Sequence, residues 1–393
     1  MWSNLPFDLL ANIFSFLPAD SLALASSVCK HWHTCVTAYP ATPAGARNPP
    51  WFVALPVRNR GHTCYTHNPI IDTWHGLFLG FLPHAIRPVA SIGGLVLLRS
   101  TTSTTLQLAI CNLFTKRYWS LPMLNIARTN PAVGVVFGLD ESPDVRFSSF
   151  RVYVAGGMSE APSGGAAYEP TLEMYDSWHD RWDIIGRMPV EFAVRLTVWS
   201  PNESVYSGGV LYWMTSARAY SVMGLDIESN SWRELSVPMA ERLEFAALVR
   251  WNGRPTLVGG TCNEGACIWE LGEGDTWELV EKIPIELGMR LLGVKGSWES
   301  TKCVGSDGAV CLYRDLGSGM VVWREVEKGR WEWLWVEGCC SVGGKQVQNI
   351  PIKGLLLHPN LATSGFPDKW LNFFVHSNSL VCHILMYHSL YVT

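Results

Sequence analysis

One short segment of the chain gathers side chains that copper ions take as ligands. His62, Cys64, Tyr65 and His67 lie close together, and imidazole and thiolate groups both bind copper. The same spacing also fits a β-strand whose residues share no role. No GxSxG, HExxH or P-loop motif occurs elsewhere in the sequence, so we predict no catalytic residue, no metal site and no cofactor.

A second candidate set consists of arginines that recur at one position of a repeated unit. Arg128, Arg195 and Arg290 each lie six residues after a proline, and Arg242 lies four residues after one. Arginine forks bind carboxylates and phosphates, so this set could hold an acidic or phosphorylated segment of a partner. The alternative is that each arginine donates hydrogen bonds to nearby loop carbonyls.

Three loops offer alternative contact sites. They span residues 159–170, 215–221 and 261–266. The second loop contains Arg218 and Tyr220, which are residue types enriched at protein interfaces.

Composition excludes several classes of protein. Thirty basic and 34 acidic residues give a net charge of −4, which does not favour nucleic-acid binding. The eleven cysteines are odd in number and form no CxxC pair. The amino terminus lacks the basic region of a secretory signal. We therefore expect free thiols in the cytoplasm or nucleus, and no apolar run is long enough to cross a membrane.

The amino-terminal residues are patterned as short helices. Leu9, Ile13 and Leu17 recur at helical spacing, with Pro6 in a first-turn position and Pro18 ending the pattern. A second apolar helical pattern starts after Asp20 and reaches Trp32. A module of about forty residues has a marginal core and is expected to depend on a partner.

The run LPFDLLANIFSFLPADSLALASSVCKHWH resembles the F-box pattern at every fixed position. That resemblance implies docking on Skp1, the adaptor of a cullin-RING ubiquitin ligase. It assigns the F-box to residues 2–45. The residues it implicates, some of which must instead fill the core of the module, are Leu5, Pro6, Leu9, Ile13, Phe14, Leu17, Leu22, Val28, Cys29, Lys30 and Trp32.

A proline-rich linker is predicted at residues 46–50, and a repeat begins after it. Each unit has an apolar strand, a polar turn, a tryptophan and then, in most units, a short step to a proline. The period of about 45–50 residues is typical of a β-propeller. The tryptophans that mark the six units are Trp74, Trp119, Trp182, Trp232, Trp277 and Trp331.

Double glycines precede several of these tryptophans. Gly156-Gly157 and Gly259-Gly260 each follow a strand, and the pattern resembles the kelch repeat. We expect each pair to form a tight strand exit, and each tryptophan to fill the gap between neighbouring blades. The fold class predicted is a small all-α module followed by an all-β propeller of six kelch-like blades, over residues 51–359. The strand at residues 354–359 is expected to close the ring, which removes exposed edges.

An F-box followed by degenerate kelch repeats resembles the plant F-box/kelch-repeat family. In that family the propeller recruits the protein to be ubiquitylated. The implied role is the substrate-recognition subunit of an SCF ubiquitin ligase, with a Skp1-like adaptor, a cullin and an unknown protein substrate as partners. Two alternatives are an F-box/propeller scaffold without a role in ubiquitylation, and a copper-dependent kelch oxidase.

The last 34 residues, 360–393, lack the repeat. We expect an atypical, poorly packed tail there. It includes Trp370 and an apolar stretch from Leu380 to Val392 that two histidines interrupt.

Overall fold

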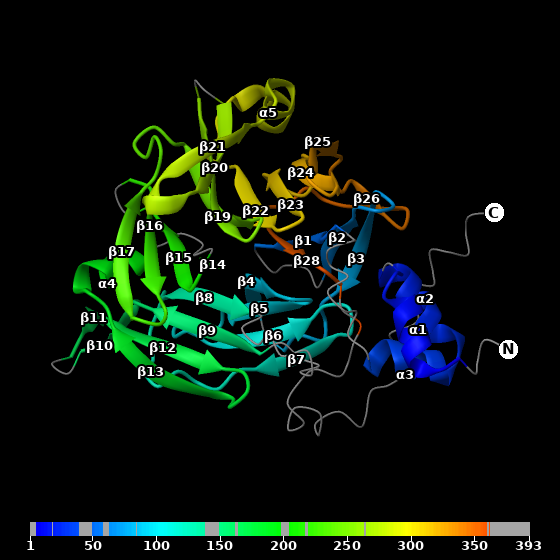
Figure 1. Cartoon of the computed structure of the whole chain (residues 1–393), viewed down its shortest axis with the longest axis horizontal. Helices are drawn as coiled ribbons and strands as arrows, with labels where there is room; N and C mark the ends of the chain where they lie inside the picture. Colours follow the sequence, from blue (N-terminus) through cyan, green and yellow to red (C-terminus); the bar gives the residue numbers. More distant parts are fainter. Residues whose placement is uncertain are drawn as a thin grey trace.

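A computed structural model of the chain describes residues 5–17, 19–38, 49–57, 63–83, 85–137, 149–161, 164–197, 204–216, 219–262, 265–359 and 361. Three short helices are followed by a ring of six β-sheets, and the helices lie beside the ring, next to its first blade (Figure 1). Within these ranges no helix combines the length and apolar character needed to cross a membrane.

The helical module consists of α1 (Phe7–Phe14), α2 (Ala19–Val28) and α3 (Lys30–Ala38). Pro6 stands at the N-cap position of α1, where a missing N–H group costs no hydrogen bond. The core is small, as expected for so short a module. Its buried members are Leu10, Phe14, Leu22, Ala25, Cys35 and Val36.

Each blade is a four-stranded antiparallel sheet. From the axis outward, blade 1 contains β28 (Ile352–Leu357), β1 (Trp51–Pro56), β2 (Thr63–Asn68) and β3 (Thr73–Phe78); blade 2 contains β4 (Ile86–Ile92), β5 (Leu95–Ser100), β6 (Leu108–Asn112) and β7 (Arg117–Ser120); and blade 3 contains β8 (Ala132–Phe137), β9 (Phe150–Ala155), β12 (Thr171–Asp176) and β13 (Arg181–Arg187). Blade 4 contains β14 (Ser204–Ser207), β15 (Val210–Thr215), β16 (Ser221–Asp226) and β17 (Ser231–Ser236); blade 5 contains β18 (Phe245–Trp251), β19 (Arg254–Thr261), β20 (Gly265–Leu271) and β21 (Trp277–Lys282); and blade 6 contains β22 (Lys302–Ser306), β23 (Ala309–Tyr313), β24 (Met320–Glu327) and β25 (Arg330–Val336). The prediction of six blades is confirmed.

The ring closes because strands from the two ends of the propeller pair within one sheet. β28 pairs antiparallel with β1, from Trp51 opposite Leu357 to Pro56 opposite Ile352. The closing strand therefore lies two residues earlier than the sequence predicts. This pairing explains why the first repeat is short, because its innermost strand comes from the end of the propeller.

The six marker tryptophans lie in the outermost strands, and they pack between neighbouring blades as predicted. In three blades the indole N–H also donates a hydrogen bond to a carbonyl at or just after the end of the outer strand of the preceding blade. These bonds join Trp74 to Glu337 (2.9 Å), Trp182 to Pro122 (2.9 Å) and Trp277 to Ser236 (2.8 Å).

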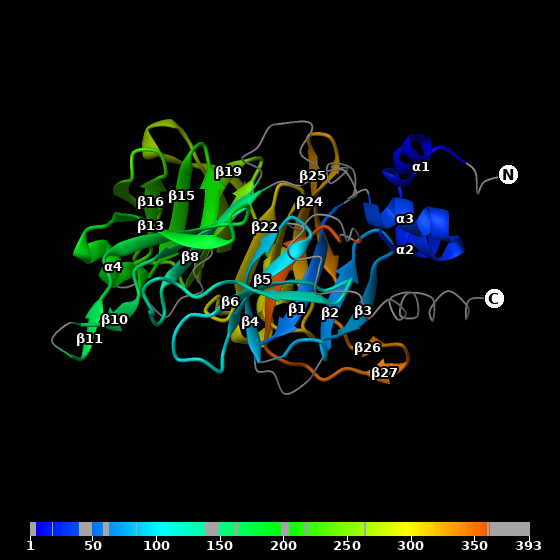
Figure 2. The ribbon, with the colours of Figure 1, turned by 90° about the horizontal axis from the view of Figure 1, so that it is seen from below.

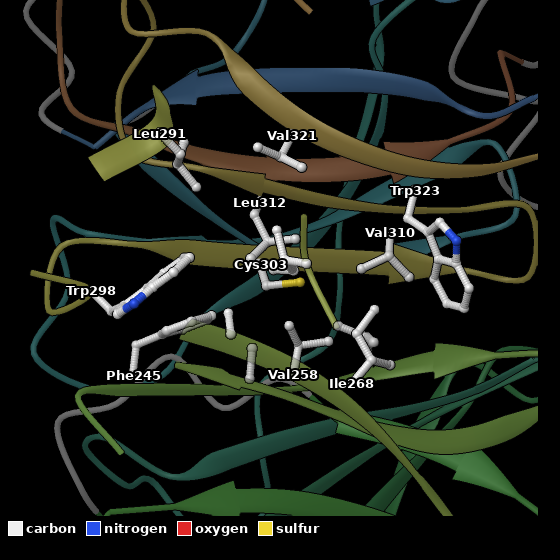
Figure 3. Packing of buried hydrophobic residues seen from close by; sticks show 14 of the residues in the cluster. Phe245, Val258, Ile268, Leu291, Trp298, Cys303, Val310, Leu312, Val321 and Trp323 are labelled. Carbon is white, nitrogen blue, oxygen red and sulfur yellow. The ribbon is translucent and has the colours of Figure 1, made fainter. Parts of the chain in front are cut away.

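The apolar core of the propeller is divided into six clusters, one at each junction between neighbouring blades. Figure 3 shows the junction of blades 5 and 6, where Val258 and Ile268 lie opposite Val310. Trp323 joins this cluster and stacks on Trp251 with ring centroids 5.1 Å apart. Each blade is thus stabilised on both sides by its neighbours.

Several elements lie between the blade strands. A hairpin of β10 (Met158–Glu160) and β11 (Ala166–Tyr168) follows β9, so the prediction of a loop over residues 159–170 is wrong. The other elements are α4 (Val190–Leu196), η3 (Glu273–Asp275), α5 (Ile285–Leu292), η4 (Gly293–Lys295), β26 (Ser341–Val342) and β27 (Lys345–Gln346).

Glycine is required at the two pairs for different physical reasons. Gly156 and Gly157 adopt φ angles of 65° and 90°, so they form the predicted tight exit from β9. Gly260 lies inside β19 without a left-handed φ, and the expectation of a turn is wrong there. A Cβ atom on Gly260 would lie 2.7 Å from the Trp298 ring, so glycine is required by close packing.

Candidate interaction surfaces

The first surface is the outer face of α1. Leu9 and Ile13 are exposed on α1, and Phe16, in the turn after the helix, is 58% exposed. These residues are spaced i, i+4 and i+7, which places them on one side of the helix. Leu10 and Phe14, one residue further along from Leu9 and Ile13, turn inward to the core.

The second helix also exposes large apolar side chains. Leu24 is exposed, and Val28, four residues later on the same face, is 63% exposed. Sequence reasoning missed Phe16 and Leu24 because neither is a fixed position of the F-box pattern. Helical spacing from Leu9 and from Val28 could have identified them.

The structure separates the predicted adaptor-binding residues by burial. Phe14 and Leu22 are core residues, and the Phe14 ring meets the edge of Trp32 with centroids 5.3 Å apart. They stabilise the module rather than present a surface. Among the remaining positions, Leu5, Leu17, Cys29 and Trp32 are half-buried, and Pro6, Leu9, Ile13, Val28 and Lys30 are exposed.

Arg128 is not available to a partner. Its side chain has no exposed surface, and its guanidinium donates hydrogen bonds to the carbonyls of Gly156 (3.1 Å) and Thr171 (3.0 Å). It also pairs with Glu173 at 2.5 Å, and this carboxylate accepts the backbone N–H of Asn125 at 2.7 Å. The prediction of substrate contact is therefore wrong for Arg128, which instead holds the strands of blade 3 together, as the structural alternative requires.

Two of the other arginines link neighbouring blades. Arg195 on α4 pairs with Glu234 on the outer strand of blade 4. Arg290 on α5 pairs with Glu337, just after the outer strand of blade 6, and its guanidinium lies 4.2 Å from the centre of the Trp335 ring. Both side chains remain partly exposed, so their substrate-binding role stays a prediction.

Arg242 and Tyr220 also stay predictions. Arg242 is exposed in the turn before β18. Tyr220 is half-buried against the cluster between blades 4 and 5, and burial raises the pKa of its hydroxyl. Arg218 lies outside the described residues.

The centre of the propeller contains a cavity of about 240 Å³. The inner strands of all six blades line it, and the charged side chains on its wall include Arg250 and Asp307. Among the described residues that line it, none belongs to the predicted arginine set. The arginines therefore do not form a ring on the wall of this cavity.

The structure does not assemble the predicted copper ligands. Cys64 is fully buried, and burial raises the pKa of its thiol to about 12, which disfavours the thiolate that binds metals. Tyr65 and His67 point to the opposite face of β2, because side chains alternate along a strand. His67 pairs with Asp72 at 2.9 Å, and His62 lies outside the described residues. Across the described part of the chain, no group of three or more potential ligands is placed to hold a metal ion.

Comparison with known proteins agrees with this architecture. The F-box domain family matches residues 2–40. Three Arabidopsis thaliana relatives match nearly the whole chain. They are F-box only protein 6 (24% identical, covering 92% of this chain and 74% of the relative), Protein UNUSUAL FLORAL ORGANS (22%, 86% and 79%) and an F-box/kelch-repeat protein (23%, 88% and 84%).

The helical module with exposed apolar side chains, joined to a closed six-bladed propeller, fits the architecture of an F-box substrate adaptor. Residues 2–40 match the F-box domain family, and the chain as a whole is similar to F-box/kelch-repeat proteins of Arabidopsis thaliana.

Proposed function

We propose that this protein is the substrate-recognition subunit of an SCF ubiquitin ligase. Its F-box binds a Skp1-like adaptor and through it a cullin, and its propeller binds the protein to be ubiquitylated. The proposal places the complex in the cytoplasm or nucleus. Catalysis belongs to the partner subunits, so the chain needs no catalytic residue of its own.

The observation that carries this proposal is the apolar surface of α1 and α2. Leu9, Ile13, Phe16, Leu24 and Val28 are all exposed, on a module whose described residues include six buried apolar side chains in one cluster. Exposed apolar residues gathered on helical faces mark an interaction site. An amphipathic helix that lays such a face into a groove is a recurrent mode of binding.

The test is co-expression of the full chain with a Skp1-type adaptor, followed by co-purification. We expect wild-type chain and adaptor to elute together, and Leu9→Asp to weaken binding at least tenfold because it places a charge in an apolar contact. Ile71→Asp is the matched control, since Ile71 is equally exposed but lies on the β2–β3 turn of the propeller. Equal adaptor binding by Leu9→Asp and wild type would refute the proposal.

A second measurement separates a ubiquitin-ligase receptor from a scaffold. Protein abundance is compared across the proteome with and without this chain, before and after proteasome inhibition. A receptor predicts at least one protein whose level falls when the chain is present and recovers on inhibition. A scaffold predicts adaptor binding without any such protein.

A further inference from the structure

Two helices of the propeller are copies of one another in sequence and position. α4 follows Pro189 with the sequence VEFAVRL, and α5 follows Pro284 with IELGMRL. Each helix connects an outer strand to the inner strand of the next blade. Each also carries an arginine that pairs with a glutamate of that next blade.

The surroundings of the two helices differ. In blade 3 the inserted β10–β11 hairpin lies beside α4, and β11 contacts the helix (Figures 1 and 2). Val194, which corresponds to Met289 of α5, is only half-exposed. In blade 5 the same connection is short, because β19 ends at Thr261 and β20 begins at Gly265. No inserted strand pairs there within the described residues, so α5 lacks the cover that α4 has.

Large apolar side chains are exposed on α5 and in the turn that follows it. Ile285 is 75% exposed, Met289 on the next turn is 68% exposed, and Val294 in the following η4 turn is fully exposed. On its opposite face Leu291 is buried in the cluster between blades 5 and 6. We call Ile285, Met289 and Val294 the α5 patch.

The α5 patch is held rigidly. The Arg314 guanidinium, from blade 6, donates a hydrogen bond to the carbonyl of Leu292 at the end of α5 (2.6 Å) and to the hydroxyl of Ser300. Arg290, in the last turn of the helix, pairs with Glu337. A fixed apolar surface loses little conformational entropy when a partner binds, which favours affinity.

The charge around the patch selects the partner. Residues 270–299 contain seven acidic and three basic side chains, and two of the acidic ones, Glu270 and Asp275, already pair with Arg254 and Arg233. Glu278 and Glu286 are exposed on β21 and α5, and Arg290 is already paired with Glu337. A partner with basic side chains beside its apolar ones matches this charge, because complementary potentials speed association and exclude acidic competitors.

We propose that the α5 patch is a docking site for an extended segment of a partner protein that carries apolar side chains flanked by lysine or arginine. This segment occupies on α5 the place that β11 occupies on α4. The proposal rests on the proposed function, in which the propeller recruits the substrate, and it names the class of segment recruited.

The test uses the full chain in complex with the Skp1-type adaptor, so that the F-box surface is covered. The probe is a synthetic twelve-residue peptide with alternating leucine and lysine, compared with a peptide in which glutamate replaces lysine. Binding is measured by fluorescence anisotropy at several salt concentrations. We expect the basic peptide to bind, and the combined Ile285→Ser and Met289→Ser substitutions to weaken it at least tenfold.

Val190→Ser on α4 is the matched control, because Val190 is exposed at the position that corresponds to Ile285. It should leave peptide binding unchanged. The proposal is overturned if the basic peptide does not bind, if the acidic peptide binds equally well, or if the α5 double variant binds like wild type. Adaptor co-purification reports separately on the F-box, so a failure of the α5 patch is distinguishable from a failure of the proposed function.

Discussion

The F-box and the propeller differ in how completely they bury their apolar side chains. The F-box has one small cluster around Leu10 and leaves several large apolar side chains exposed. The propeller has six clusters, each shared by two blades, and its ring is closed by β28. A closed ring pairs its own strand edges and buries its own apolar surface, whereas a three-helix module of this size leaves apolar surface exposed. The difference agrees with the proposal that the first domain binds an adaptor and that the second is a stable platform for recognition.

The largest loss of stability is expected from Arg128→Met in the propeller. The substitution leaves Glu173 as a buried carboxylate without its cation, which typically costs about 3–5 kcal/mol. Urea denaturation followed by tryptophan fluorescence should show the lower free energy of unfolding. A loss below about 1 kcal/mol would show that the buried pair is not needed to hold blade 3.

A comparable test of the other domain is Leu10→Ala. Leu10 is almost fully buried, and truncation of a buried leucine costs about 2–5 kcal/mol. The expected result is loss of hydrogen-exchange protection in α1–α3, while the blade strands stay protected. Restored protection on addition of the adaptor would show that the F-box depends on its partner for stability. Loss of protection in both domains together would show that the two domains unfold as one unit.

The smallest effect is expected from Arg195→Ala. The pair with Glu234 is partly exposed, and such pairs contribute about 0–1 kcal/mol. The shift in melting temperature should be slight and should shrink further as salt is added. A shift as large as that of Arg128→Met would mean that the exposed link between blades 3 and 4 matters as much as the buried one.

The contrast between Arg128 and Arg195 shows what local spacing in the sequence can predict about a side chain and what it cannot. Both lie six residues after a proline, so they look equivalent in a single sequence. The fold buries Arg128 against Glu173 and leaves Arg195 on a helix that the sequence did not predict. Burial depends on residues about 45 positions away, such as Glu173, which local spacing does not reveal.

The same limit applies to the F-box. Its pattern identified the module, but Leu9 and Leu10 are identical residues with opposite fates, one exposed and one buried. Helical periodicity gives the faces of a helix, and only packing against α2 and α3 decides which face turns inward.

The sequence by itself determined the F-box, the six tryptophan-marked blades and the closure of the ring. These features follow from short-range patterns, namely helical spacing, a repeat period and turn residues. The tertiary structure alone decided that Arg128 is structural, that Gly260 makes room for Trp298, and that the α5 patch is uncovered. Each of these depends on contacts between segments distant in the chain, and such contacts leave no periodic trace in one sequence.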